Sequence, residues 1–460
     1  MGFVVYDLET SGLHKRFDQI LQFAAIHTDD ELEPIDTPLH IQARLLPSIL
    51  PSPKALLITG LTIEEIIDPT VPSLYNAICE IHDAFLRWSP SMFLGFNSIR
   101  FDEEFLRQAF YQNLRHPIYV TSINNNRGDV LRLARAVALL NPGALTIPRN
   151  LEGRRSFRLS DIGQANGIDF DRSHDALSDA QTTLALCRVI RDRAPDAWSS
   201  FSRFANRRNV VEFVQEEEAF ALLDDRADSD FVCVTLVSKH PTDRNLHYCL
   251  DLATDMESLG RLSDEELCVE VSRRDGPIRK LRANASPVMA QLWELEDQSL
   301  LPAPSQDIER VAQKVRTDEE FLQRLSSAIQ ASQPVWPTSE HVEEQIYENF
   351  IGDTDGALCQ QFHLAHWPDR ANFIGRFGDR RLQRLAQRLL LHERPDLLDQ
   401  HRQSALCGEV QRRLDGSIPD APWTTLPKAT AEIQALSAEC SESDRRILDG
   451  FSKYLANRFP

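Results

Sequence analysis

The sequence predicts a mixed α/β protein of several domains. Three strand-like runs follow one another at the N-terminus, strands then alternate with helical segments to about residue 195, and the composition changes twice after that point. Strands followed by alternating strands and helices are typical of a mixed sheet covered by helices. A chain of 460 residues is long enough to form two or three hydrophobic cores.

The first 200 residues contain the signals of the mixed domain. Residues 3–7, 20–28 and 39–46 have strand composition, and the turn-like segments between them indicate an antiparallel meander. Residues 92–97 predict a further buried strand. Apolar residues at helical spacing predict helices over residues 73–88, 102–114, 129–140 and 174–193.

Two further domains are expected after this one. The runs "FVCVTLVSKH" and "HYCLDLAT" indicate strands joined by a turn, and from residue 340 onward nearly every segment has helical spacing. We therefore divide the chain into residues 1–200, a smaller β-containing domain at 201–338, and a helical domain at 339–460.

Charge and cysteine content limit the class of protein. The net charge of −19 argues against a general nucleic-acid binder, but residues 127–158 and 369–394 each carry seven arginines against two and three acids. Such islands are either solvated helix faces or phosphate-binding surfaces. The eight scattered cysteines predict free thiols and a cytoplasmic protein. No apolar run approaches the roughly 18 residues of a membrane span, so no membrane association is expected.

Acidic side chains occur at three element ends. Asp7 and Glu9 end the first strand on one face, Asp102 opens a helix after a buried strand, and Asp179 begins the last long helix, five residues after His174. Converging carboxylates require a cation, and oxygen ligands favour Mg²⁺ or Mn²⁺. Two such ions would suit attack on a phosphodiester, with His174 near the water as a base. Taken singly, each signal has a simpler explanation: a solvated strand edge, an N-cap at Asp102, or chance spacing.

The order and spacing of these motifs resemble a known family. "DLETSGL", "GFNSIRFDEEFL" and "HDALSDA" look like the three motifs of the DEDDh exonuclease superfamily. "LPSPKALLITGLT", "SFRLSDIGQANGI", "DRNLHYCLDLATDMESL" and "FGDRRLQRLAQRLL" are similar to segments of bacterial exonuclease I, which degrades single-stranded DNA. The resemblance is dense over residues 3–190 and thinner to the C-terminus.

The resemblance implies a fold and a set of roles. It implies a ribonuclease H-like exonuclease domain, an SH3-like domain and a helical domain. It also implies a monomeric, Mg²⁺-dependent 3′→5′ exonuclease with two ions, replaceable by Mn²⁺, which acts in DNA repair and docks on the acidic tail of single-stranded DNA-binding protein. The residues that match the family's functional positions are Asp7, Glu9, Asp102 and Asp179 as metal ligands, His174 as general base, and Glu9, Thr10, Ser11, Asn97, Phe101, Arg127 and Arg158 around the substrate.

Two other functions remain open from the residues alone. A 3′→5′ exoribonuclease or proofreading exonuclease would use the same chemistry, although short members of the superfamily end near residue 200. A non-catalytic nucleic-acid-binding or partner-docking protein would have no use for an acid cluster beside phosphates. Because the motifs are complete by Asp179, we expect the later domains to be dispensable for bond cleavage, with the arginines of residues 369–394 forming a groove for DNA.

Overall fold

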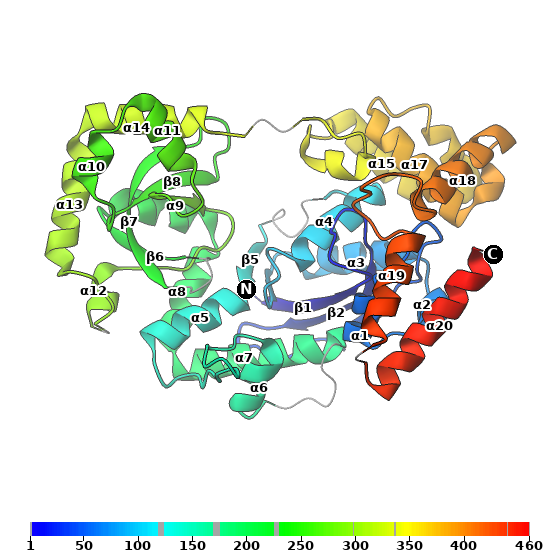
Figure 1. Ribbon diagram of the computed structural model, residues 1–460, viewed down its shortest axis with the longest axis horizontal. Coiled ribbons are helices and arrows are strands. Elements are labelled where there is room, and N and C mark those ends of the chain that lie inside the picture. Colours follow the sequence, from blue (N-terminus) through cyan, green and yellow to red (C-terminus); the bar gives the residue numbers. More distant parts are fainter. Residues whose placement is uncertain are drawn as a thin grey trace.

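A computed structural model describes residues 2–117, 124–168, 175–224, 230–297, 299–334, 337–438 and 440–459. We name three parts: the N-terminal part (residues 2–205), the middle part (206–334) and the helical part (337–459). Figure 1 shows the middle part at the upper left and most of the helical part at the upper right of the N-terminal part, while the last helices of the chain, in red, lie along its right side. Within the described ranges, no helix is both long enough and apolar enough to span a membrane.

A five-stranded mixed sheet of order β3-β2-β1-β4-β5 forms the centre of the N-terminal part. β1, β2 and β3 pair antiparallel, which confirms the predicted meander, whereas β4 and β5 run parallel to β1. The strands are β1 (Phe3–Thr10), β2 (Ile20–Thr28), β3 (Leu39–Gln42), β4 (Met92–Gly95) and β5 (Asn126–Asp129). β5 is absent from the sequence prediction, which began a helix at Asp129 instead.

Helices cover both faces of this sheet, because β1 is apolar on both sides. Phe3 and Val5 face a core that includes residues of α5, α7 and α8, whereas Val4, Tyr6 and Leu8 face α3 and α4. The helices are α1 (Pro53–Thr59), α2 (Ile63–Ile67), α3 (Leu74–Trp88), α4 (Asp102–Gln112), α5 (Val130–Leu140), α6 (Leu159–Ala165), α7 (Ala176–Arg193) and α8 (Pro195–Phe204).

The middle part is built on an antiparallel sheet of order β10-β6-β7-β8-β9. The predicted hairpin corresponds to β7 and β8. The elements are α9 (Arg207–Glu216), β6 (Phe220–Leu223), β7 (Phe231–Lys239), β8 (Leu246–Asp251), α10 (Met256–Gly260), α11 (Asp264–Ser272), β9 (Ile278–Arg282), β10 (Met289–Ala290), α12 (Leu292–Glu296), α13 (Ser305–Thr317) and α14 (Glu319–Ala331). The predicted boundary after residue 200 falls inside α8, whose Phe201 packs in the first core and Phe204 in the second.

The helical part packs on the N-terminal part through shared cores. Tyr75 and Tyr111 lie in one core with α15 and α17, and α1 and α2 share another with α19 and α20 (Figure 1). The elements are η2 (Val342–Tyr347), α15 (Asp353–Leu364), α16 (Trp367–Arg370), η3 (Ala371–Phe373), α17 (Arg380–Glu393), η4 (Pro395–Leu397), α18 (Gln400–Leu414), α19 (Leu426–Leu436) and α20 (Glu442–Arg458). A chain without the later domains would lose these shared cores. That the later domains are dispensable for bond cleavage stays a prediction.

His392 of α17 lies 3.1 Å from the Ser48 hydroxyl of the N-terminal part, and the interface between these two parts should weaken in acid. Burial, aided by Arg388 and Arg413, lowers the pKa of His392 to about 4, so the unfolded chain binds a proton that the folded chain does not. The contribution of neutral His392 to the free energy of unfolding is therefore complete above pH ~6.5. Below that pH it falls by roughly 1.4 kcal/mol per pH unit. We expect urea unfolding to show a smaller loss between pH 7.5 and 5.5 in His392→Gln, by about 1.4 kcal/mol. An unchanged loss would contradict this assignment.

Candidate active site

Asp7 and Glu9 lie on the face of β1 that looks toward α7. Odd-numbered residues of the strand share this face with Phe3 and Val5, which pack in the same core as α7. Buried neighbours on both sides of the strand fix its position. The two carboxylates are therefore held by a rigid central strand rather than by a loop.

Asp179 reaches the same place from the first turn of α7. Ala176 and Ala180 are fully buried, and their small side chains let the helix approach the sheet closely. One carboxylate oxygen from each of Asp7, Glu9 and Asp179 lies within 4.8 Å of the others. These three acids, predicted from separate motifs, form the centre of the site.

Asp102 comes to the site from the start of α4. It is the buried first residue of α4, and Phe101 takes the N-cap position without a side-chain hydrogen bond, so the alternative of Asp102 as an N-cap is wrong. Burial raises the pKa of Asp102 to about 8, against hydrogen bonds from its own backbone and from that of Leu8. The Leu8 contact places this carboxylate against β1, next to Asp7 and Glu9 in the strand.

The acids raise one another's pKa values. Burial raises the pKa of Asp7 well above its ordinary value, and the charges of Asp102, Asp179 and Glu9 add to the effect. Burial and then Asp179 raise the pKa of Glu9 to about 8. Without a cation, the cluster would hold protons at neutral pH. Its all-oxygen ligand set fits a hard divalent ion such as Mg²⁺ or Mn²⁺.

The predicted base, His174, lies outside the described residues. Its neighbour in sequence, Asp175, is the N-cap residue of α7, the helix that carries Asp179. The charge of Asp175 also contributes to the raised pKa values of Asp7 and Glu9. Asp175, the residue that follows position 174 in the sequence, thus lies close to the acid cluster.

Thr10 and Ser11 are buried where β1 ends. The Thr10 hydroxyl donates to the Gly12 carbonyl at 2.8 Å, and the Ser11 hydroxyl contacts Asp18 at 3.4 Å. Both side chains therefore shape the loop that follows β1. Asn97 is exposed, with a positive φ of 61°, and its backbone N–H donates to Asp129 at 3.0 Å. Phe101 is half-buried and packs against Phe105, with the two ring planes tilted by 56°.

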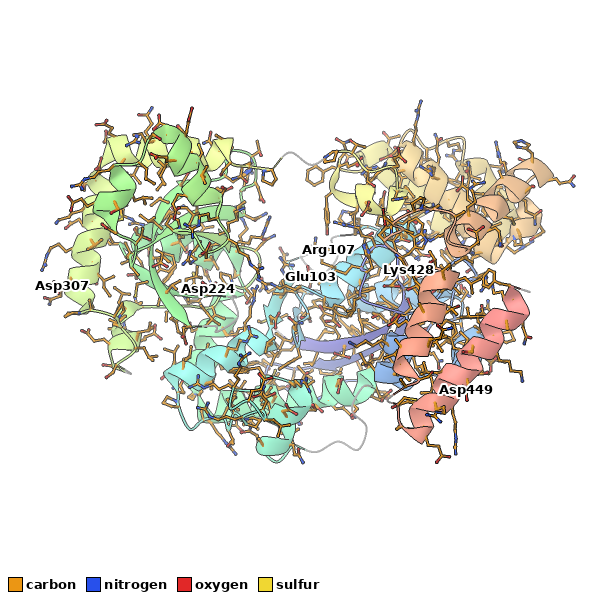
Figure 2. All side chains as sticks on the ribbon, in the orientation of Figure 1. Glu103, Arg107, Asp224, Asp307, Lys428 and Asp449 are labelled. Carbon is orange, nitrogen blue, oxygen red and sulfur yellow. The ribbon has the colours of Figure 1, made fainter. Side chains whose placement is uncertain are left out.

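Arg127 and Arg158 have different surroundings. Arg127 is buried, forms an ion pair with Glu103, and donates from Nε to the Asn284 carbonyl of the middle part at 2.6 Å. Although burial raises it, Arg127 and Arg107 lower the pKa of Glu103 below its usual value. Figure 2 places Glu103 and Arg107 at the centre of the molecule. Arg158 is exposed at the N-cap of α6.

A large cavity lies where the three parts face one another. Its volume is about 1450 Å³. The four acids do not line it, but residues 13–16 and residues 99–100, in the loops after β1 and β4, do. The lining contains two acids, Glu104 and Asp224, against eleven basic side chains: Lys15, Arg16, Arg100, Arg107, Arg127, Arg132, Arg273, Arg274, Arg279, Lys280 and Arg282. At least six of these eleven side chains pair with carboxylates: Arg16, Arg107, Arg127, Arg273, Arg279 and Arg282. A strongly acidic protein thus presents a cavity whose lining has more basic than acidic side chains.

The predicted arginine groove of residues 369–394 stays a prediction, and several of its arginines form contacts within the helical part instead of facing the central cavity. Arg370 is buried with its guanidinium 4.1 Å from the Trp367 ring, and Arg381 is buried against Asp379. Arg388 pairs with Glu343, and Arg394 with Asp396. These arginines stabilise the helical part, and none of the island's arginines lines the central cavity.

Sequence reasoning missed several residues around the site. Asp129 is buried at the end of β5, caps α5 and raises the pKa of Asp102. Its signal was available, because polar residues that end neighbouring parallel strands meet at one edge of a sheet. The basic residues 273–282 had no such signal, since they lie far along the chain from Asp179, the last acid of the three acidic motifs.

The chain resembles known exonucleases over its whole length. A family profile described as "Exonuclease" matches residues 4–187, and one described as "Exonuclease I C-terminal domain" matches residues 340–458. Exodeoxyribonuclease I of Escherichia coli K12 is 29% identical over 383 residues, which cover 78% of this chain and 78% of that protein.

Solved structures agree with these matches and confirm the predicted fold class. An exonuclease I from Methylocaldum szegediense is 26% identical, with 100% of both chains covered and a TM-score of 0.89. A zinc-bound form of the E. coli exonuclease I–single-stranded DNA complex is 25% identical, with 99% of both chains covered and a TM-score of 0.86.

Proposed function

This chain belongs to the bacterial exonuclease I family, and from that premise we propose that it is a 3′→5′ exodeoxyribonuclease that degrades single-stranded DNA to nucleoside 5′-monophosphates. The observation that carries the proposal is the meeting of Asp7, Glu9 and Asp179, whose oxygens lie within 4.8 Å of one another, together with a central cavity of about 1450 Å³. A partly buried cluster of acids this close together needs cations. A cavity with more basic than acidic side chains attracts a polyanion.

Asp7, Glu9, Asp102 and Asp179 are the residues proposed to hold two Mg²⁺ ions, for which Mn²⁺ could substitute. When bound, such ions would lower the pKa of the attacking water and place positive charge beside the leaving oxygen. The protein's own contribution is to fix the ligands: Asp7 and Glu9 through β1, Asp179 through α7, and Asp102 through its contact with Leu8. Because burial and mutual repulsion favour the protonated acids, metal binding would release protons.

The remaining predicted residues are proposed to position the substrate. His174 would accept the proton of the attacking water. Thr10, Ser11, Asn97 and Phe101 surround the expected place of the 3′-terminal nucleotide. Arg158, exposed at the start of α6, is proposed to approach a phosphate, and Arg127 to do so while paired with Glu103.

The central cavity is proposed as the path of the single strand. Single-stranded DNA binders combine a basic groove for the backbone with sites that accept any base. Lys15, Arg16 and Arg100 come from loops next to the acids, whereas Arg274 and Lys280 come from the middle part. A flexible strand that leaves the active site would meet these side chains in turn.

Reversing one charge of this path should weaken binding measurably. Lys280 is exposed in the cavity lining, so Lys280→Glu should reduce the affinity for a long single strand. The slope of log affinity against log salt should become shallower by about 0.7, the value of one lost phosphate contact. Lys453→Glu is the matched control, because it makes an equal charge change at an exposed position of α20. Identical slopes for the two variants, measured by fluorescence anisotropy, would contradict the proposed path.

The family also suggests an oligomeric state, a location and a partner for this protein. We propose that the chain is monomeric, cytoplasmic and active in DNA repair. We also propose that it docks on the acidic C-terminal tail of single-stranded DNA-binding protein, a peptide whose charge suits exposed basic side chains.

The function is tested by digestion of matched end-labelled substrates. Single- and double-stranded DNA and RNA of one sequence are incubated with and without Mg²⁺. The proposal expects mononucleotides from single-stranded DNA alone, released from the 3′ end and only with metal. Equal degradation of RNA would favour an exoribonuclease, and binding without degradation would favour a non-catalytic protein.

A further inference from the structure

The loop that joins β1 to β2 begins two residues after Glu9 and is tightly folded. The Ser11 N–H donates to the Gln19 carbonyl at 2.9 Å, and the His14 N–H donates to the Asp18 carboxylate at 2.7 Å. A Cβ at Gly12 would lie 2.4 Å from the Asp18 carboxylate, so a larger residue there would have to displace the Asp18 side chain that holds the loop. The loop therefore has little freedom to change its shape internally.

Phe17, near the end of this loop, packs outside the core of its own domain. Its ring is 2% exposed. The ring centroids of Trp423 and His341 lie 5.0 and 5.5 Å away, and the Arg413 guanidinium lies 5.2 Å from the Phe17 centroid. These three residues belong to the helical part. Phe17 thus anchors the loop in a small separate core that also contains Ala421.

The residues that receive Phe17 are themselves held in place. The Trp423 indole N–H donates to the Arg413 carbonyl at 2.7 Å, and the Arg413 guanidinium pairs with the buried Glu343. Beside Phe17, Arg16 pairs with Glu344 at 3.3 Å. The socket for Phe17 is therefore rigid, and the loop is attached to it by packing and by charge.

The other side of the loop faces the substrate path. Leu13 is 80% exposed and lines the central cavity together with His14 and Lys15. The same short loop therefore connects three places: the strand of Asp7 and Glu9, the cavity, and the socket in the helical part. A shift of the Phe17 anchor would move the loop relative to the metal ligands.

We propose that Phe17 is a positioning residue for cleavage, and that the helical part completes the active site by holding the loop after Asp7 and Glu9. The inference rests on the proposed function and deepens it. Reactive groups must be aligned closely, and a displacement of about 1 Å can cost on the order of 10²-fold in rate. The helical part then contributes to the chemical step as well as to the shape of the DNA path.

The test compares single-turnover removal of the first nucleotide from a 5′-labelled 20-mer. Phe17→Ala should lower the rate at saturating DNA by roughly 10- to 100-fold, while the half-saturating DNA concentration changes less than about threefold because the cavity still holds the strand. Phe17→Leu, which refills most of the socket, should recover most of the rate.

The reciprocal variant tests whether the effect passes through the socket. Trp423→Ala should slow cleavage similarly. The double variant should be no slower than the slower single variant, because both substitutions remove the same contact between Phe17 and Trp423. Phe373→Ala is the control for lost stability, because Phe373 is buried in a different core of the helical part. It should lower the melting temperature and leave the rate unchanged.

Three results would overturn the inference: a folded Phe17→Ala protein that cleaves at the wild-type rate, multiplicative rate losses in the double variant, or an equal rate loss in Phe373→Ala. Failure of the wild-type protein itself to cleave single-stranded DNA would refute the proposed function instead, so the two failures are distinguishable.

Discussion

Asp7→Asn is expected to abolish metal-dependent cleavage while the protein remains folded. Asp7 is half-buried on the central strand, and one of its carboxylate oxygens lies within 4.8 Å of those of Glu9 and Asp179. Loss of water activation and of leaving-group stabilisation at roughly 3 kcal/mol each corresponds to about 10⁴-fold in rate. The measurement is nucleotide release from single-stranded DNA at saturating Mg²⁺.

The same substitution should stabilise the metal-free protein at alkaline pH. Burial raises the folded-state pKa of Asp7, so its favourable contribution is complete below pH ~4 and is lost as the pH rises through the raised value. Removing the carboxylate should therefore raise the melting temperature in EDTA most clearly near pH 9. Mg²⁺ should stabilise wild type more than Asp7→Asn.

The control for this experiment is Asp449→Asn, an equal change at an exposed position of α20. Asp449 lies far from the centre of the molecule (Figure 2). It should leave cleavage and the Mg²⁺-dependent rise in melting temperature unchanged. If Asp7→Asn keeps near-wild-type activity in protein shown to be free of other nucleases, the two-metal assignment fails.

The acid cluster was predictable because its signals are local. An apolar run that ends in Asp-x-Glu predicts two carboxylates on one face of a strand, and β1 carries them so. Asp179 could be placed because it stands near the start of a long helical segment. The matching order of the motifs then indicated that these segments meet, and the structure brings Asp7, Glu9 and Asp179 together.

The role of the helical part was not predictable, because it depends on contacts between distant segments. Phe17 resembles any loop aromatic in sequence, and only the fold brings Trp423 and His341 onto its ring. The arginines of residues 369–394 resemble a phosphate-binding surface, yet Arg370 is buried under Trp367. Charge counted along a chain does not reveal which side chains face solvent, so the basic cavity escaped notice.

His174→Ala is expected to lower turnover by roughly 10²- to 10⁴-fold, the usual contribution of a general base, with a much smaller loss of DNA affinity. Below a pH of about 6.5 the wild-type rate should fall as the histidine gains a proton. That decline should be absent from the variant, whose residual rate does not depend on this group. His401→Ala, on exposed α18, is the matched control.

A second titration must be separated from that of His174. The pKa of Glu9 is raised to about 8 by burial and by Asp179, so protons compete with metal for the cluster and also slow the enzyme at low pH. Raising the Mg²⁺ concentration favours the ionised carboxylates, so the decline in rate that comes from the acid cluster should shift to lower pH. The decline that comes from protonation of a general base does not depend on the Mg²⁺ concentration once the metal site is saturated. If saturating Mg²⁺ removes the whole pH dependence of wild type, or if His174→Ala keeps the wild-type rate at neutral pH, His174 is not the base.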